Sequence, residues 1–183
     1  MTNGVKYWNL RPIDLVLTTG KGIVPNTIKR FSGGKDDPNC ATHAAIVVEF
    51  HGQLLLMEIL GKKGGISLSP FERYLNNNKR WIVGVRRLKD FIDMERIQMD
   101  IALDYRKQLK YPFKDLLMFT DWFIFRNVKN DKQEPYCSEY YVEKTWSFTD
   151  YPDEFWNKVS PRDLQKSNLF YDLDWEIVKW KKN

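Results

Sequence analysis

Short apolar runs, separated by polar turns, mark the first half of the chain. Residues 42–50 read Thr-His-Ala-Ala-Ile-Val-Val-Glu-Phe, a β-branched and apolar run that predicts a buried strand. A turn at residues 51–53 precedes a second apolar run at 54–60, which predicts the returning strand of a hairpin. Further strands are predicted at residues 14–18, 66–68, 81–86 and 175–180. The pattern therefore predicts a sheet built largely from the middle of the chain.

Helices are predicted mainly in the second half. Asp93 is a suitable N-cap, and one face of the helix after it carries apolar residues at helical spacing: Met94, Ile97, Ile101, Tyr105 and Leu109. Ser160-Pro-Arg-Asp combines an N-cap with a proline at the first helical position, which predicts a short helix. Other helical segments are predicted at residues 26–31, 71–75, 113–125 and 137–146. Strands followed by helices indicate one α+β domain over residues 1–183, built on an antiparallel sheet with packed helices.

Composition agrees with a folded domain. Hydrophobic residues make up 43% of the chain and aromatic residues 15%, which excludes general disorder. The net charge of +5 comes mainly from dispersed lysines, so we interpret it as solvated surface and expect no nucleic-acid partner. No apolar run reaches the roughly 18 residues that a membrane span needs, and the first residues lack the apolar stretch of a secretory signal. We therefore expect a cytoplasmic protein, or one released without a signal peptide.

Cys137 is the first candidate for chemistry. It lies in Glu134-Pro-Tyr-Cys-Ser-Glu, where a turn-forming proline precedes a predicted helix. The free N–H groups and the dipole at a helix start favour a thiolate, and they can also stabilise an oxyanion. The alternative is that Cys137 is a small buried residue, as most single cysteines are. The chain has only two cysteines, so a disulfide framework is not expected.

The two histidines differ in their surroundings. His43 opens an apolar strand, where an imidazole is costly unless a partner satisfies it. His51 lies beside Gly52 at a predicted turn and is expected to be solvated. His43 is therefore the candidate base for Cys137.

Glu58 interrupts the apolar run Leu-Leu-Leu-Met-Glu-Ile-Leu and is the candidate to orient His43. A hairpin loop with an even number of residues puts positions 43 and 58 on one face of the sheet. A four-residue loop at 50–53 pairs Ala45 with Glu58, which makes Glu58 a diagonal neighbour of His43 at roughly 7–8 Å. An odd loop would put the two side chains on opposite faces, and Glu58 would then belong to an exposed sheet edge.

The ordered motifs resemble the circularly permuted papain-like hydrolases of the NlpC superfamily, and the YiiX-like branch is the most similar in appearance. The resemblance covers about residues 11–168. It is carried by Asp14-Leu-Val-Leu, Thr42-His-Ala-Ala-Ile-Val-Val, Leu56-Met-Glu, Tyr136-Cys-Ser-Glu-Tyr-Tyr-Val and Ser160-Pro-Arg-Asp-Leu. In that group the histidine strand precedes the cysteine helix, the reverse of the order in papain.

The resemblance implies a role for each matching position. Cys137 would be the nucleophile, His43 its base and Glu58 the orienting residue, while Tyr111 would assist the oxyanion or contact the substrate. Two positions depart from the family pattern, because Ile13 and Lys110 stand where glycine is common. The implied substrates are small peptide-like amides, including those derived from cell walls, or acyl groups. This chemistry uses no cofactor and no metal ion.

Other readings of the same residues remain. A metal site would draw on Cys40, His43, His51 and Cys137, but only Cys40 and His43 have a usable local spacing. Cys40 as nucleophile lacks a helix start behind it. The glycines at 20, 22, 33 and 34 match no phosphate-binding loop. A second class of function is a catalytically silent binding or structural module with the same fold.

Overall fold

The computed structural model describes residues 3–6, 10–59, 65–71, 74, 79–90, 92–107, 137–152, 155, 159–173 and 176–179. Its strands are β1 (Asn3–Lys6), β2 (Leu15–Gly20), β3 (His43–Phe50), β4 (Gln53–Ile59), β5 (Ile66–Ser69), β6 (Arg80–Leu88), β7 (Phe170–Asp172) and β8 (Glu176–Lys179). Its helices are α1 (Ile23–Phe31), α3 (Met94–Lys107), α6 (Cys137–Thr145) and α8 (Pro161–Lys166), with a 3-10 turn at Trp146–Phe148.

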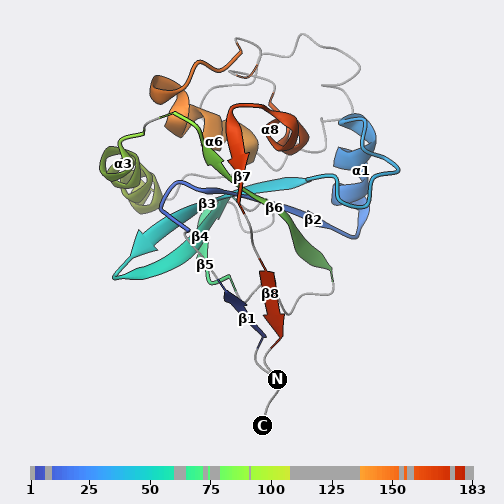
Figure 1. Ribbon diagram of the computed structural model, residues 1–183, viewed down its shortest axis with the longest axis horizontal. Coiled ribbons are helices and arrows are strands. Elements are labelled where there is room, and N and C mark those ends of the chain that lie inside the picture. The colour runs from blue at the N-terminus through green and yellow to red at the C-terminus, as the bar shows by residue number, and fades with distance from the viewer. Residues whose placement is uncertain are drawn as a thin grey trace.

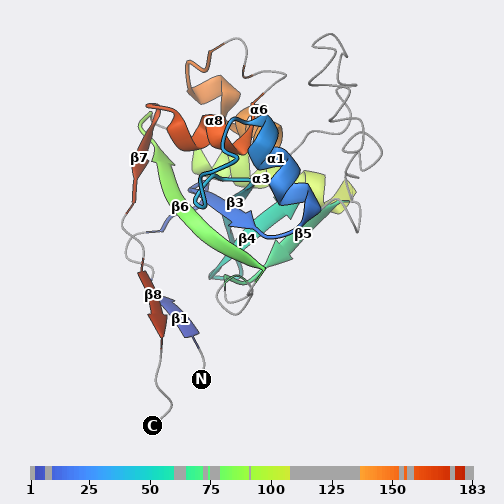
Figure 2. The same cartoon turned by 90° about the vertical axis from the view of Figure 1, so that its right-hand side faces the viewer.

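Six strands form one sheet in the order β5-β4-β3-β2-β6-β7, and every neighbouring pair is antiparallel. Helices α3, α6 and α8 lie on the same side of this sheet in both views (Figures 1 and 2). Strands β1 and β8 form a separate antiparallel pair on the other side (Figure 1). The predicted α+β class with an antiparallel sheet is confirmed.

Alternating side chains of the central strands supply two apolar layers. The layer that meets the helices includes Leu15, Leu17, Ala44, Ile46 and Met57 from the strands, and Tyr140, Tyr141, Val142 and Leu164 from α6 and α8. The opposite layer includes Val16, Ala45, Val47, Leu56, Ile82 and Val85, together with Phe71 and Tyr74. Because both faces of β2 and β3 are covered, these strands read as nearly continuous apolar runs.

The β3–β4 hairpin has the register predicted from the even-loop argument. Ile46 pairs with Met57 and Phe50 with Gln53, so the same register places Ala45 opposite Glu58. The loop contains two residues, where the argument considered four, and both numbers are even. His51 and Gly52 both have positive φ, at 51° and 74°, as a tight turn between twisted strands requires.

Both predicted helix starts are confirmed. The Asp93 carboxylate accepts the backbone N–H of Arg96 at 3.0 Å ahead of α3. Ser160 and Asp163 form a reciprocal capping box around Pro161 at the start of α8.

The extents of the helices differ in part from the predictions. Helix α1 begins at Ile23, three residues earlier than predicted. In α3 only Ile97 and Ile101 of the predicted apolar face are buried, while Met94 and Tyr105 are exposed. Leu109 and the helix predicted at 113–125 lie outside the described residues, as does most of the helix predicted at 71–75. Among the helices that the structure describes, none combines the length and the apolar character needed to cross a bilayer.

Ile13 adopts a backbone conformation that is unusual for a β-branched residue. Its φ is 72°, in the left-handed region, and its side chain is 1% exposed. Its N–H donates to the Val47 carbonyl at 2.7 Å, and its carbonyl accepts the Tyr141 hydroxyl at 3.0 Å. The strained residue is therefore held by β3 on one side and by α6 on the other.

We expect Ile13→Gly to be more stable than Ile13→Ala, by about 0.5–1 kcal/mol. Both variants lose a buried side chain, at a cost of about 2–5 kcal/mol, but only glycine also relieves the left-handed strain of about 1–2 kcal/mol. Urea denaturation of the two variants measures the difference. Leu15, a buried residue at the start of β2, is the control, because there the alanine variant should be more stable than the glycine variant. If the alanine variant is the more stable one at position 13 as well, strain at Ile13 is contradicted.

Candidate active site

Cys137 is the first residue of α6, and its side chain is half-buried. The backbone N–H groups of Ser138 and Ala44 donate to its sulfur, one from the helix start and one from β3. The Ser138 hydroxyl donates to the Val159 carbonyl at 2.6 Å, which fixes the first turn of the helix against the segment that precedes α8. The thiol therefore lies where a helix start and a strand start meet.

His43 is the first residue of β3 and pairs with Thr18 of β2. Its Nε2 lies 3.4 Å from Oε1 of Glu58, and the two side chains are 18% and 1% exposed. This is an ion-pair contact without the alignment of a hydrogen bond, since among the described residues neither atom has a hydrogen-bond partner. Because Nε2 faces Glu58, Nδ1 is the nitrogen that remains for the hydrogen bond with Cys137.

The electrostatics of the pair favour charge on both partners. Burial disfavours the positive form of His43, but the charge and hydrogen bond of Cys137, followed by the contact with Glu58, raise the pKa of the imidazole to about 10. Burial likewise disfavours the thiolate, yet the charge and hydrogen bond of His43 and the two backbone N–H groups lower the pKa of Cys137 below its ordinary value of 9.0. Each partner therefore stabilises the charged form of the other, an imidazolium beside a thiolate.

Three of the four predicted site residues lie together in the structure: Cys137, His43 and Glu58. Tyr111 lies outside the described residues. His51 is exposed at the hairpin turn, at the far end of β3 from His43. Cys40 is fully buried, and its sulfur lies 3.7 Å from the Ser32 hydroxyl. Among the described residues, no three His, Cys, Asp or Glu side chains are grouped so as to hold a metal ion.

The Ala44 N–H was not among the predicted site groups. A backbone N–H group belongs to no particular residue type, so the sequence does not reveal it. Only the packing of β3 against α6 brings this N–H to the sulfur. The Ser138 N–H, by contrast, follows from the position of Cys137 at a helix start.

No protein-family model and no curated protein matches the chain.

We expect Cys137 to react with iodoacetamide at pH 6–7, well below the range of a free thiol, because His43 stabilises the thiolate. His43→Ala removes that stabilising charge, so the pKa of Cys137 should rise by at least about one unit, a tenfold loss of thiolate near neutral pH. Alkylation rates followed by intact mass over pH 4–10 measure the shift.

Cys40→Ala is the control for this labelling. Cys40 is buried, so its removal should leave the fast labelling unchanged. Equal, slow labelling of both cysteines in the wild-type protein would contradict the assignment of Cys137 as a reactive thiolate.

Proposed function

We propose that the protein is a cysteine-dependent hydrolase or acyltransferase that acts on an amide or ester bond of a peptide-like substrate, through an acyl-enzyme on Cys137. One observation carries the proposal: the Cys137 thiol, at a helix start, contacts one side of His43 while Glu58 contacts Nε2 of the same ring. A nucleophile, a base and a group that orients the base are the parts that acyl transfer requires.

Each step of the proposed reaction follows from these contacts. The Cys137 thiolate attacks the carbonyl carbon, and the tetrahedral intermediate collapses as His43 protonates the leaving amine or alcohol. Neutral His43 then takes a proton from water, or from a second acceptor, which attacks the thioester and releases the acyl group. The thiolate and imidazolium are restored, and Glu58 holds the ring in one orientation throughout.

The order of the elements supports a permuted papain-like fold of the NlpC type. The histidine strand β3 and the carboxylate strand β4 precede the cysteine helix α6 along the chain, and α6 packs against β3. Ile13, which departs from the family pattern, still adopts the positive φ that a glycine would supply there. The chain therefore enters β2 with the same backbone conformation, although residue 13 is an isoleucine.

We expect the acyl-enzyme to be detectable by mass. p-Nitrophenyl acetate should acetylate the wild-type protein once, and Cys137→Ala should abolish both the adduct and turnover of a panel of peptidyl amides. His43→Ala should lower kcat by about 10²–10⁴-fold, the usual contribution of a general base. Cys40→Ala should behave as wild type. An adduct that persists in Cys137→Ala, or no adduct and no turnover with any substrate of the panel, would refute the proposal.

We expect Glu58→Ala to lower kcat by about 10²-fold, because the imidazole loses its orienting partner. Glu58→Gln keeps a side-chain oxygen beside Nε2 and should retain most of the activity. It also removes a negative charge that raises the pKa of His43, so the alkaline limb of the kcat/KM profile should move below its wild-type position near pH 10. The pH–rate profiles of the two variants measure both effects. Equal activity of Glu58→Ala and the wild type would remove Glu58 from the site.

A further inference from the structure

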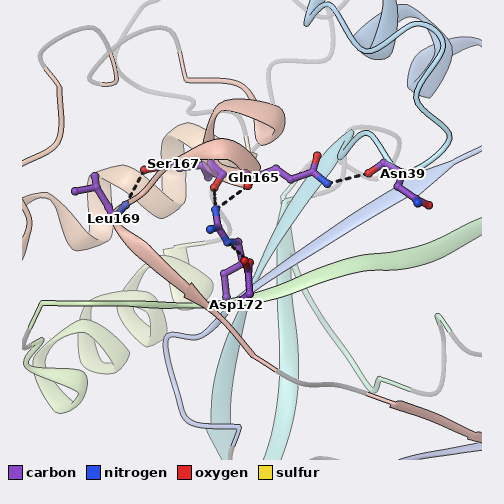
Figure 3. Close-up of polar contacts among 7 residues, drawn as sticks. Asn39, Gln165, Ser167, Leu169 and Asp172 are labelled. Carbon is purple, nitrogen blue, oxygen red and sulfur yellow. Dashed lines mark hydrogen bonds and ion pairs between the residues drawn. The ribbon is translucent and has the colours of Figure 1, made fainter.

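Gln165, in the last turn of α8, holds the chain immediately ahead of the histidine strand. Its Oε1 accepts the backbone N–H of Ala41 at 2.8 Å, and its Nε2 donates to the carbonyl of Asn39 at 2.9 Å. Figure 3 shows the amide reaching from the helix to Asn39. One side-chain amide thus pairs with the backbone on both sides of Cys40, much as a neighbouring strand would.

Gln165 is itself fixed by a buried arginine. Arg86 of β6 is 6% exposed, and its Nη1 donates to the carbonyls of Leu164 and Gln165, each at 2.7 Å. Its Nε donates to the Asp172 carboxylate at 2.7 Å (Figure 3). A cation at the C-terminal end of a helix satisfies its last carbonyls and favours its dipole. The position of Gln165 is therefore set by the sheet and not by α8 alone.

The opposite side of the same loop is also closed. Cys40 is fully buried, and a Cβ added to Gly34 would clash with its sulfur, so the loop is in close contact with the backbone at Gly34. The Thr42 N–H then donates to the Thr18 carbonyl at 2.9 Å. Residues 39–42 are thus held by three partners: α8, the turn at Gly34, and β2.

This loop leads directly into the candidate active site. Ala41 precedes His43 by two residues and Ala44 by three, and both His43 and the Ala44 N–H contact the Cys137 sulfur. A shift of the backbone at Ala41 would move the imidazole and the N–H donor together. Glu58 and Ser138, which lie on β4 and α6, would stay in place.

We infer that Gln165 is a positioning residue of the active site, whose side-chain amide fixes residues 39–41 and thereby places His43 and the Ala44 N–H against Cys137. The inference deepens the proposed function and rests on it. Gln165 does not touch the sulfur, the imidazole or the carboxylate in the described structure. Its effect is transmitted through the backbone that enters β3.

The test is the pH dependence of Cys137 alkylation in Gln165→Ala. The titratable groups that face this thiol in the described structure are His43 of β3 and, behind it, Glu58 of β4, and neither is altered by the variant. We expect the midpoint of the alkylation profile to rise by at least about one pH unit, a tenfold loss of thiolate near neutral pH. The kcat with a peptidyl amide should fall by about tenfold or more, with little change in KM, because the Gln165 amide is bonded to the backbone of Asn39 and Ala41 and acts only through it.

Arg162→Ala is the matched control. Arg162 lies on the same helix and donates from Nη1 to the Ser32 carbonyl at 3.0 Å, so it holds the loop through Ser32, beside the turn at Gly34, and not through the backbone of residues 39 and 41. It should lose stability to urea to an extent similar to Gln165→Ala without moving the alkylation midpoint. Gln165→Glu, which keeps an acceptor for the Ala41 N–H but loses the donor to Asn39, should lie between the wild type and Gln165→Ala. It serves in place of Gln165→Ala if the alanine variant does not fold.

The outcomes separate the two proposals. A low wild-type midpoint that is unchanged in Gln165→Ala or Gln165→Glu would overturn the positioning role and leave the proposed function standing. Equal shifts in Arg162→Ala and Gln165→Ala would also overturn it, since they would reflect general loosening. An ordinary thiol midpoint in the wild type would overturn both proposals.

Discussion

The antiparallel register between β3 and β4 is the constraint on which the site depends. It places Ala45 opposite Glu58, so that the Glu58 carboxylate reaches diagonally to His43 on the same face. A slip of one residue would turn every side chain of β4 to the other face and remove the carboxylate from the imidazole. The register is fixed by the tight turn at His51 and Gly52 and by the apolar layers on both faces of the hairpin. The core and the site are therefore specified by the same pairing.

The buried charges of the site are costly, and the fold offsets that cost locally. Glu58 is 1% exposed, and its ion-pair partner among the described residues is His43, whose Nε2 lies 3.4 Å from Oε1. An ion pair taken out of water often gains little or nothing over an apolar pair, because desolvation opposes the attraction. The thiolate is stabilised additionally by two backbone N–H groups, which are fixed by the helix and the strand and need no reorganisation when charge forms. Such an arrangement is the one that the proposed reaction requires.

Much of this structure was predictable from the sequence, for physical reasons that differ from residue to residue. The strand at His43 and the helix start at Ser160 were predicted because local pattern and capping chemistry decide them. The same-face geometry of Glu58 was predicted only for an even loop, and the two-residue loop meets that condition. Helix α1 was predicted too short, because its start at Ile23 follows a glycine with no side-chain cap.

Other parts of the site depend on contacts between segments far apart in the chain. Gln165 acts on Asn39 and Ala41 across more than 120 positions, and nothing in its own neighbourhood distinguishes it from a surface residue of a short helix. The Ala44 N–H has no side-chain identity, and the positive φ of Ile13 contradicts the preference of its residue type. Tyr111, named from the family resemblance, lies outside the described residues. Local rules therefore identified the side chains of the candidate site that lie together, while the groups that hold them in place are defined only by the tertiary fold.

The charged pair also has a consequence for the pH dependence of folding. His43, whose pKa rises from 6.5 to about 10 in the fold, contributes stability that is complete below pH 6.5 and lost as pH rises toward 10. Cys137, whose pKa falls below 9.0, contributes stability that is complete above pH 9 and lost as pH falls through its folded value. Where both contributions change with pH, their effects on the unfolding free energy cancel. The folded chain, with imidazolium and thiolate, then holds as many protons as the unfolded chain, with neutral histidine and thiol. A charged pair of this kind, which the proposed reaction requires, therefore does not make the stability of the fold depend on pH where both contributions change.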